Sequence, residues 1–299
     1  LCHKLGPAIA AGNAVVAKPS PKAPLTAGRL AELAEKAGWP RDLFQVVHGG
    51  AAAALALARA PIDLLSFTGG PEAGLALKRA SGLVRCLMEL GGNDPLFVMP
   101  DADLAKAVST VIGHRFEIAG QSCAAVKKLF LHADIEQEFT DRLLADVAKV
   151  TFGDPSFEHT DMGPVIDLAG AAKVAEKVKA TLAQGGRLLA GGSHEDCLFQ
   201  PTIIADVAAD AAVIADETFG PVIAIRRFSH PAEAIAEVNA SDFGLQAGIF
   251  TNDHALIKTF SRDLLVGGVM INEGPDFRAE HVPFGGIKRS GLGREGVRI

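Results

Sequence analysis

No apolar segment of this 299-residue sequence approaches the roughly 20 residues that a helix needs to cross a bilayer, and the Ala-rich run Ala51–Ala60 is far too short. The first residues contain neither the charged region nor the apolar core of a signal peptide. A formal net charge of -6 gives no electrostatic reason to expect a nucleic acid or an anionic membrane as partner. These absences predict a soluble protein.

Metal-binding and disulfide patterns are missing as well. The nine histidines form no His-x-x-x-His or His-Glu-x-x-His pattern, so no metal cofactor is expected. The cysteines are scattered, and none belongs to a Cys-x-x-Cys pair, which argues against a zinc site or a disulfide framework and favours a reducing, cytoplasmic location. The four cysteines are Cys2, Cys86, Cys123 and Cys197.

Both ends of the sequence are abrupt. Leu1–Ala11 reads as a helix, but no Ser, Thr, Asp or Asn precedes it to cap its free amides. Leu292–Ile299 stops without a cap or a terminating glycine. We therefore expect the sequence to be a fragment of a longer protein.

The first third of the sequence alternates short apolar runs with helical stretches. A chain of this length can bury two medium-sized cores, so we predict two domains. The alternation predicts a parallel sheet covered by helices, in the doubly wound pattern of nucleotide-binding α/β folds. The expected strands are Ala14–Lys18, Phe44–His48, Ile62–Phe67, Val84–Leu90 and Pro95–Met99, and the expected helices are Thr26–Ala37, Ala51–Arg59 and Pro71–Ala80.

Longer helices follow from Asp103 onward, which places a domain boundary near Gly92–Pro100 and a second α/β domain up to about Gly286. No internal repeat is apparent. The expected helices here are Leu104–Ala119, Ile135–Val150 and Leu168–Gln184, and the expected strands are Lys128–His132, Arg187–Ala190, Val222–Phe228, Gly248–Phe250 and Gly268–Asn272.

Cys123 and Glu89 are the candidate reactive residues. Cys123 ends the run Gly120-Gln121-Ser122-Cys123, which we expect to form a tight turn near a helix N-terminus, where the helix field favours a thiolate. Glu89 ends a strand before Gly91-Gly92, at the edge where doubly wound sheets bind ligands, and the two glycines allow a close backbone approach there. Taken alone, the pattern favours Cys123 as a buried packing residue and Glu89 as a solvated acid at a strand end.

Two weaker signals lie in the first domain. Phe67-Thr68-Gly69-Gly70-Pro71 joins a strand to a helix start, whose free amides can receive a pyrophosphate, although such turns are common. Lys18 closes the first strand and could reach a ribose, although a surface lysine is the alternative. Glu217-Thr218-Phe219-Gly220-Pro221 and Pro283-Phe284-Gly285-Gly286 each place an aromatic residue beside glycine and read singly as packed turns.

Together these segments resemble the aldehyde dehydrogenase superfamily over essentially the whole chain. The motifs follow the order of that family, and Cys123 lies 34 residues after Glu89, a typical spacing. The resemblance implies a doubly wound nucleotide-binding domain followed by an α/β catalytic domain, and an NAD(P)-dependent oxidation of an aldehyde. By this resemblance residues 1–94 form a partial dinucleotide-binding domain, 95–286 the catalytic domain, and 287–299 a truncated segment that returns toward the first domain.

The resemblance also assigns roles to single residues. Cys123 is the nucleophile that forms a thiohemiacetal and then a thioester, and Glu89 is the base for the hydrolytic water. The cofactor-binding residues include Lys18 at the adenosine ribose, the Gly69-Gly70 turn at the pyrophosphate, Glu217 at the nicotinamide ribose and Phe219 beside the nicotinamide. The remaining cofactor contacts are Ser20, Thr68 and Leu90, and the substrate pocket contains Gln121, Ser122, Arg278, His281 and Phe284.

Three departures from the family pattern matter. The asparagine that binds the oxyanion would precede residue 1, and the loss of one such donor costs roughly 3–4 kcal/mol of transition-state stabilisation in comparable sites. The segments that build the family's homodimers or homotetramers are likewise absent. Pro21 stands where an acidic residue often binds the adenosine 2′-hydroxyl, with Lys22 adjacent. Both NAD⁺ and NADP⁺ are therefore expected as cofactors.

The substrate is indicated only as a class. Glu89–Pro95 and Cys123–Lys127 resemble the phosphonoacetaldehyde dehydrogenase branch, and Phe284–Val297 also suits lactaldehyde and non-phosphorylating glyceraldehyde-phosphate relatives. Those branches usually carry arginine before the cysteine as an anion clamp, where this sequence has Ser122. The prediction is a small polar aldehyde, with an anionic one favoured only if Arg278 or His281 replaces that arginine.

Two other functions fit parts of the sequence. A CoA-acylating relative would transfer the acyl group to a thiol, but such enzymes typically lack the glutamate base that Glu89 supplies. A non-catalytic homologue would need neither Cys123 nor Glu89. A plain dinucleotide-binding module is excluded because about two-thirds of the chain lies beyond the nucleotide-binding part.

Overall fold

The computed structural model describes residues 1–279 and 281–296, which divide into two compact units. Unit 1 comprises Leu1–Leu90 with the segments Ala279–Gly285 and Gly291–Ile299, and unit 2 comprises Gly91–Arg278 with Gly286–Ser290. The chain therefore passes from unit 1 to unit 2 at Leu90, directly after Glu89.

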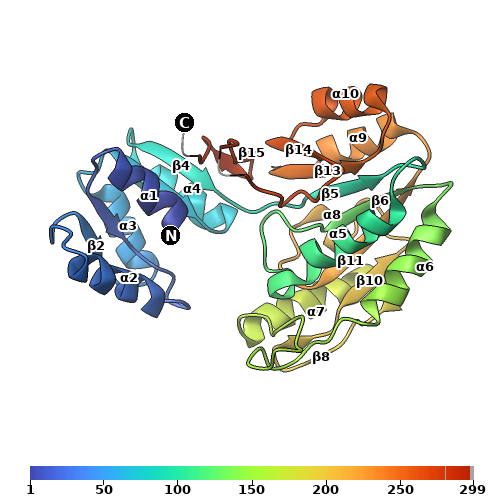
Figure 1. Cartoon of the computed structure of the whole chain (residues 1–299), viewed down its shortest axis with the longest axis horizontal. Coiled ribbons are helices and arrows are strands. Elements are labelled where there is room, and N and C mark those ends of the chain that lie inside the picture. Colours follow the sequence, from blue (N-terminus) through green and yellow to red (C-terminus); the bar gives the residue numbers. More distant parts are fainter. Residues whose placement is uncertain (280, 297–299) are drawn as a thin grey trace. The chain divides into compact units, whose positions relative to one another are not determined.

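Unit 1 alternates helices and short strands from its first residue (Figure 1). Pro71 occupies the first turn of α4, where its missing N–H is not needed. The elements of unit 1 are α1 (Cys2–Ala10), β1 (Val15–Ala17), α2 (Leu25–Lys36), β2 (Phe44–Val46), α3 (Ala51–Arg59), β3 (Leu64–Thr68), α4 (Pro71–Ser81), β4 (Arg85–Glu89) and β16 (Gly291–Leu292).

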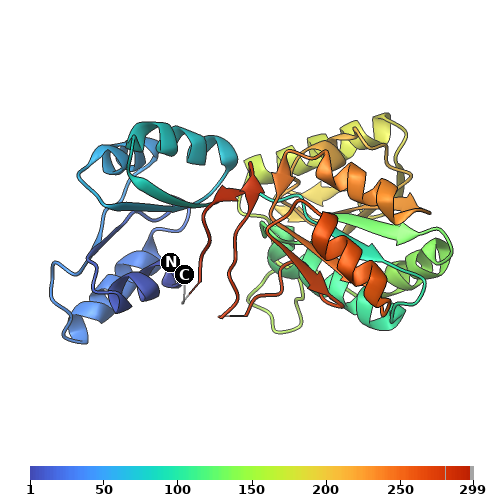
Figure 2. The same cartoon turned by 90° about the horizontal axis from the view of Figure 1, so that it is seen from above.

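The strands of unit 1 form two small sheets. β1 pairs with β2 in parallel, and β3 pairs with β4 in parallel. The short strand β16 adds to the other edge of β4 in the antiparallel sense. Figure 2 shows α4 running alongside these strands, where Leu77 of α4 packs against Cys86 and Met88 of β4. The parallel βαβ units match the pattern predicted from the sequence.

Unit 2 is the larger unit. Side-chain caps begin three of its helices, α5, α7 and α10: Asp103, Asp167 and Asp253 each accept hydrogen bonding from a backbone amide of the first turn. Its elements are β5 (Pro95–Val98), α5 (Leu104–Phe116), a 3-10 turn (Glu117–Gly120), β6 (Lys128–His132), α6 (Glu136–Val147), α7 (Leu168–Ala183), β7 (Arg187–Ala190), β8 (His194–Glu195), β9 (Leu198–Phe199), β10 (Thr202–Ala205), α8 (Ala212–Ala215), β11 (Val222–Phe228), α9 (Pro231–Asn239), β12 (Phe243–Gly244), β13 (Gln246–Phe250), α10 (His254–Asp263), β14 (Gly268–Ile271) and β15 (Ile287–Lys288).

A seven-stranded sheet organises unit 2 in the order β14-β13-β5-β6-β11-β10-β7, and every pair is parallel except β10 with the edge strand β7. Helices cover both faces (Figures 1 and 2). Leu96 and Leu129 face α5 and α6, whereas Phe97 and Phe130 face α9 and α10. On β10 and β11, the face that carries Ile204 and Ala224 packs against α7 and α8. Burial on both faces explains why these strands read as continuous apolar runs.

Several elements differ from the sequence-based prediction. The helix predicted as Leu104–Ala119 ends at Phe116, because Ile118 and Ala119 adopt positive φ angles that no helix allows. The strand β10 and the helices α9 and α10 were not predicted from the sequence. Both helices carry start signals, Pro231 in the first turn of α9 and the cap Asp253 before α10.

The two units and the predicted domains differ at their edges. The sequence places the boundary at residues 94 and 95, and the structure separates the units at Leu90 and Gly91. Residues 279–285, expected in the second domain, group with unit 1. In the predicted return segment 287–299, β16 pairs with β4 of unit 1, β15 pairs with β12 of unit 2, and residues 297–299 lie outside the described residues.

Across residues 1–279 and 281–296, no helix has both the length and the apolar character that a transmembrane span requires.

Candidate active site

Cys123 lies in a turn of unit 2 between α5 and β6. The turn expected before it is present, but the helix expected after it is not: Cys123 and Ala124 form a turn that leads directly into the strand at Lys128. The prediction of a helix N-terminus at Cys123 is therefore wrong. Cys123 is half-buried, whereas Ala124, Ala125 and Val126 are almost fully buried. The interpretation of Cys123 as one more buried packing residue does not hold.

The backbone before Cys123 is strained. Ile118 (φ 51°), Ala119 (φ 53°) and Gly120 (φ 69°) are three consecutive residues in the left-handed region. A β-branched residue there is an outlier that the surrounding structure must hold in place. Gly120 is required by packing too, since a Cβ at this position would lie 2.4 Å from the carbonyl oxygen of Gly220. This turn is thus fixed against the loop that carries Glu217.

A buried lysine fixes the backbone of the cysteine turn through hydrogen bonds. Lys127 Nζ donates hydrogen bonds to the carbonyl oxygens of Ser122 (2.9 Å) and Cys123 (2.6 Å). The same nitrogen lies 3.5 Å from Glu217 Oε1, and the Lys127 side chain is only 1% exposed. One ammonium group therefore joins the cysteine turn to the carboxylate predicted to bind the nicotinamide ribose.

Gly91 and Gly92 complete the packing around this carboxylate. The Gly92 amide donates a hydrogen bond to Glu217 Oε1 (3.0 Å). A Cβ at Gly91 would lie 2.3 Å from Glu217 Oε2, and one at Gly92 would lie 2.4 Å from the Cys123 carbonyl oxygen. The close backbone approach predicted for this glycine pair is present, and its neighbours are Glu217 and Cys123.

Two further charges are buried around Lys127. Burial raises the pKa of Asp94 to about 7, an effect that the nearby Lys127 opposes. Arg115 is fully buried and donates hydrogen bonds to the carbonyl oxygens of Thr218 (3.0 Å) and Gly220, and burial lowers its pKa to about 9. Burial likewise lowers the pKa of Lys127, while Glu217 and Asp94 raise it. The site in unit 2 thus rests on a group of buried ionic side chains.

Glu89 lies in unit 1 and is buried, with 4% of its surface exposed. It closes β4, paired with Thr68 of β3 on one side and with Gly291 of β16 on the other. Its Oε1 atom lies so close to Gly285 that a Cβ there would approach it to 2.8 Å. The interpretation of Glu89 as a solvated acid is therefore wrong.

The candidate pyrophosphate turn adjoins Glu89. The Gly69 amide donates to the Glu89 carbonyl oxygen (3.1 Å), and Thr68 and Gly70 are exposed. Helix α4 begins after Gly70 without a side-chain cap, and nothing lies within 4 Å of the position of a Cβ on Gly70. The start of this helix is open to an anion. Leu90 packs instead against Gly74 of the same helix.

Lys18 follows the end of β1 and is half-buried. Its Nζ donates to the carbonyl oxygens of Pro19 (2.5 Å) and Gly49 (3.1 Å), so it links the loops that follow β1 and β2. The hydroxyl of Ser20 is exposed and accepts a hydrogen bond from the Lys22 amide (3.2 Å). Lys18 is thus tied to the backbone within unit 1, a contact that a plain surface lysine would lack.

The predicted substrate-pocket residues are divided between the units. In unit 2, Gln121 bonds the Ile118 carbonyl oxygen (2.9 Å) and the Ile166 amide (2.8 Å), so it braces the cysteine turn. Arg278 is half-buried, and the cofactor candidate Phe219 is 47% exposed. In unit 1, His281 is exposed, whereas Phe284 is buried and pairs with Glu295.

Unit 2 thus brings Ser122, Cys123 and Glu217 together, and unit 1 brings Thr68, Gly69 and Glu89 together. Lys127 and Arg115 also support this site, although neither was predicted from the sequence as a site residue. The signal for Lys127 was present, since a charge inside the apolar run Ala124–Leu131 is expected to have a buried partner.

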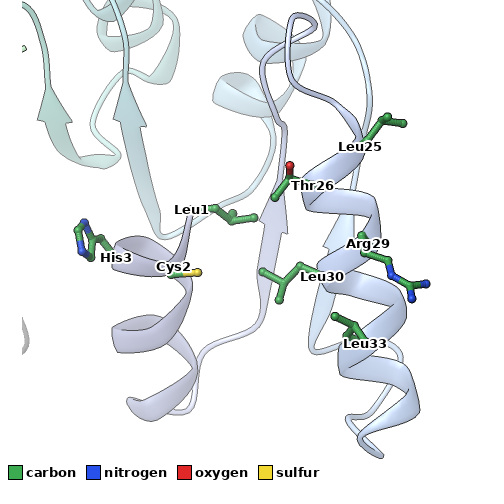
Figure 3. Close-up of a pocket in the computed structure, with 8 residues that line it drawn as sticks. All are labelled: Leu1, Cys2, His3, Leu25, Thr26, Arg29, Leu30 and Leu33. Carbon is green, nitrogen blue, oxygen red and sulfur yellow. The ribbon is translucent and has the colours of Figure 1, made fainter. Parts of the chain in front are cut away.

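A hollow of about 700 Å³ lies between α1 and α2 in unit 1, and none of the predicted site residues belongs to its lining (Figure 3). Leucines dominate its wall, and Arg29 points away from it along α2. The lining residues are Leu1, Cys2, His3, Leu25, Thr26, Arg29, Leu30 and Leu33. Among the described residues, no group of three or more His, Cys, Asp or Glu side chains is arranged to hold a metal ion.

Solved structures share this fold over nearly the whole chain. A structure described as an NADP-dependent enzyme of E. coli aligns with a TM-score of 0.96 and 40% identity, covering 98% of this chain and 62% of the other. The glyceraldehyde-3-phosphate dehydrogenase GapN of Methanocaldococcus jannaschii, in complex with NADP, aligns with a TM-score of 0.95 and 37% identity, covering 99% and 66%. The predicted α/β fold class is confirmed.

Curated relatives agree. The chain is 40% identical over 300 residues to the 3-sulfolactaldehyde dehydrogenase of Priestia aryabhattai, matching 100% of this chain and 63% of that protein. It is 39% identical to the sulfoacetaldehyde dehydrogenase of Neptuniibacter caesariensis, matching 99% and 65%. The chain thus spans less than two-thirds of the length of these relatives. The profile of the aldehyde dehydrogenase family matches residues 1–299. The chain belongs to the aldehyde dehydrogenase family.

Proposed function

We propose that this chain carries the reactive residues of an NAD(P)-dependent oxidation of a small polar aldehyde to its carboxylic acid. The observation that supports this most strongly is the half-exposed Cys123 in a turn held by Lys127 and Gly92, whereas the three residues that follow it are buried. A nucleophile must meet its substrate from a fixed position, and this turn provides both the exposure and the order.

In this proposal Cys123 reacts as a thiolate. Its sulfur attacks the carbonyl carbon of the aldehyde, and the carbonyl electron pair moves onto oxygen to give a thiohemiacetal. Loss of a hydride from the same carbon leaves a thioester on Cys123. Glu89 removes a proton from the water that attacks this thioester, which releases the carboxylic acid and restores the Cys123 thiolate.

The side chains that would hold the cofactor fit its groups. The α4 start at Gly70 is uncapped and open, as a pyrophosphate requires. Lys18 and Ser20 are proposed at the adenosine ribose. Thr68, directly before the Gly69-Gly70 turn, and Leu90, directly after the neighbouring strand β4, are proposed as further cofactor contacts. Glu217 and Phe219 are proposed at the nicotinamide ribose and ring. When bound, the nicotinamide accepts the hydride.

Both NAD⁺ and NADP⁺ are proposed. Pro21 puts no negative charge beside a 2′-phosphate, and Ser20 is exposed next to it. Similar structures are described as complexed with NADP or as NAD-dependent, which agrees with either choice.

The relatives suggest that the small polar aldehyde carries an anionic group. Names among them include 3-sulfolactaldehyde, sulfoacetaldehyde and aspartate-semialdehyde dehydrogenases, alongside lactaldehyde dehydrogenases. Ser122 provides no cation before Cys123. Arg278 is half-buried and belongs to the same unit as Cys123, so it is the cation we propose for such a substrate.

The direct test is stopped-flow detection of NAD(P)H with a panel of small aldehydes that includes sulfonated, carboxylated and neutral members, each with NAD⁺ and with NADP⁺. The wild-type chain should form NAD(P)H, and Cys123→Ala should form none. Glu89→Gln should give a single burst and then stall at the thioester, because the hydrolytic water lacks its base.

Steady turnover by Glu89→Gln would refute the assignment of the base. Faster release with CoA than with water would favour the acylating alternative. Absence of NAD(P)H from the folded chain and also from a longer version of the protein would favour the non-catalytic one.

A further inference from the structure

The Cys123 turn is held by a side chain that no step of the proposed chemistry uses. Lys127 lies four residues after the nucleophile, directly before β6, and its ammonium group turns back toward the chain that precedes it. An ammonium group has three N–H donors. Two of them reach the carbonyl oxygens of Ser122 and Cys123, and the same nitrogen faces Glu217 Oε1 at 3.5 Å.

The surroundings of Lys127 are charged on several sides although the side chain is buried. Glu217 and Asp94 attract its ammonium group, Arg115 repels it, and the Cys123 thiol is near enough to interact with it. The Lys127 amide donates to the Asp94 carbonyl oxygen (3.0 Å), which fixes the start of β6 beside β5. A buried charge is retained only where such partners stabilise it, so the position of Lys127 is closely determined.

The carbonyl group of Cys123 is therefore confined from two directions. Lys127 Nζ bonds its oxygen at 2.6 Å, and the Gly92 backbone lies so close to it that a Cβ would approach to 2.4 Å. Gly92 also donates to Glu217, which itself faces Lys127. These four residues close a ring of contacts within unit 2, and a change at Lys127 reaches the nucleophile through a single hydrogen bond.

The next residue provides a contrast. Lys128 is also buried, and its pKa is lowered to about 8, with burial as the main cause. Lys128 is the first residue of β6, and the charges that act on it beyond Asp94 and Lys127 are those of Glu237 and Lys288. The two adjacent buried lysines share Asp94 but differ in their other charged neighbours, and of the two it is Lys127 that is bonded to the Cys123 turn.

We propose that Lys127 is a positioning residue for the nucleophile, whose ammonium group fixes the Ser122–Cys123 turn and, through Glu217, joins that turn to the cofactor-binding loop. This inference rests on the proposed function in taking Cys123 as the nucleophile and Glu217 as a cofactor ligand. Lys127 contacts neither substrate nor cofactor in this proposal; it acts through the backbone of Cys123.

The test is the rate at which iodoacetamide alkylates Cys123, measured by peptide mass mapping between about pH 6 and pH 10, because alkylation reports the thiolate and its position. Lys127→Met keeps the length of the side chain and removes its charge and donors. We expect this variant to alkylate Cys123 about tenfold more slowly near neutral pH, with the pH midpoint moved upward, since charge-assisted bonds are lost. Lys127→Arg should bring the rate back to within about threefold of wild type.

Two controls separate positioning from loss of structure. Cys197 belongs to the same unit and packs against its core, so its alkylation rate reports unfolding of unit 2. Lys128→Met removes the neighbouring buried lysine and should leave Cys123 at the wild-type rate. If Lys127→Met also speeds the alkylation of Cys197, unit 2 has loosened in that variant. Lys127→Gln is then used instead, and the alkylation rates of Cys123 and Cys197 are measured in the same way.

A wild-type or higher rate at Cys123 with Cys197 unchanged would overturn the inference, and so would an equal loss in Lys128→Met. Alkylation needs neither aldehyde nor cofactor. A wild-type chain that forms no NAD(P)H, yet whose Cys123 depends on Lys127, would count against the proposed function and in favour of this inference.

Discussion

The two units differ in how completely they bury their strands. In unit 2 every residue of β5, β10 and β13 is buried, and helices pack on both faces of a seven-stranded sheet. In unit 1 the strands β1 and β3 contain no fully buried residue, and the sheets have two and three strands. The cysteine turn is therefore attached to the more deeply packed framework, whereas Glu89 is one of few deeply buried side chains in a thinner one.

This difference shows where stability and function are connected. A residue in a deep core is held by many neighbours, so strain such as that at Ile118 and buried charges such as Lys127 can be tolerated there. A unit with shallow burial gains less stability from its apolar core, so it can offset less of the cost of backbone strain or of a buried charge. The following changes test the comparison, beginning with the largest expected effect.

Truncation of a central aromatic side chain should separate the units most clearly. Phe130 is buried in the middle of β6 and stacks on Phe97, with ring centroids 4.9 Å apart. Phe130→Ala should lower the free energy of unfolding of unit 2 by about 3–5 kcal/mol. Phe44→Ala, at the start of the short strand β2, should cost unit 1 less. Trp39, the single tryptophan, reports unit 1 by fluorescence, and Cys197 alkylation reports unit 2. Equal losses would contradict the comparison.

The buried carboxyl group of Asp94 should make unit 2 depend on pH. Its pKa rises from 3.8 to about 7 on folding, mainly through burial, so the folded state binds more protons than the unfolded state between these values. Stability therefore falls as pH rises through this window. Asp94→Asn has no carboxyl group to titrate. As pH rises through this window, its free energy of unfolding should increase relative to that of wild type by up to about 1.4 kcal/mol per pH unit. The measurement is Cys197 protection in guanidinium chloride at several pH values; a constant difference between the two proteins would contradict the shift.

Relief of the strain before Cys123 should have a smaller effect. Ile118 is 66% exposed and has a φ of 51°, which asparagine adopts more readily. Ile118→Asn should stabilise unit 2 by about 1 kcal/mol, seen as a higher midpoint in guanidinium chloride. Ile166→Asn, also at an exposed isoleucine of unit 2 but without a positive φ, is the matched control and should change nothing. Destabilisation by Ile118→Asn would show that the isoleucine side chain makes a necessary contact.

Exposed ion pairs should contribute least and should not distinguish the units. Arg29 pairs with Glu32 on α2, and Arg142 pairs with Glu138 on α6. At least half of each of these four side chains is exposed. Glu32→Gln or Glu138→Gln breaks one pair, and each should change the free energy of unfolding by less than about 0.5 kcal/mol. A larger loss in one unit alone would mean that its surface contributes more than its core suggests.

Much of this architecture is readable from local patterns. The parallel strands of unit 2 are apolar runs, and the glycine pair Gly91-Gly92 correctly predicted a close backbone approach. What the sequence did not reveal depends on contacts between distant segments. Ile118 and Ala119 have good helical character, yet the fit of Gly120 against Gly220 ends the helix before them. The apolar run around Lys127 indicates a buried charge, but its partner Glu217 lies 90 residues away in the sequence and is identified only in the folded structure.

Three glycines around the proposed nucleophile also determine how the site can be diversified. Gly92, Gly120 and Gly220 face backbone or side-chain atoms where any Cβ would stand within 2.4 Å, so these positions admit no other amino acid without rearrangement. Random libraries that include them would consist mostly of misfolded members. Substitutions near Cys123 are therefore better placed at Ser122 and Ile118, since Ser122 is half-buried and Ile118 is exposed.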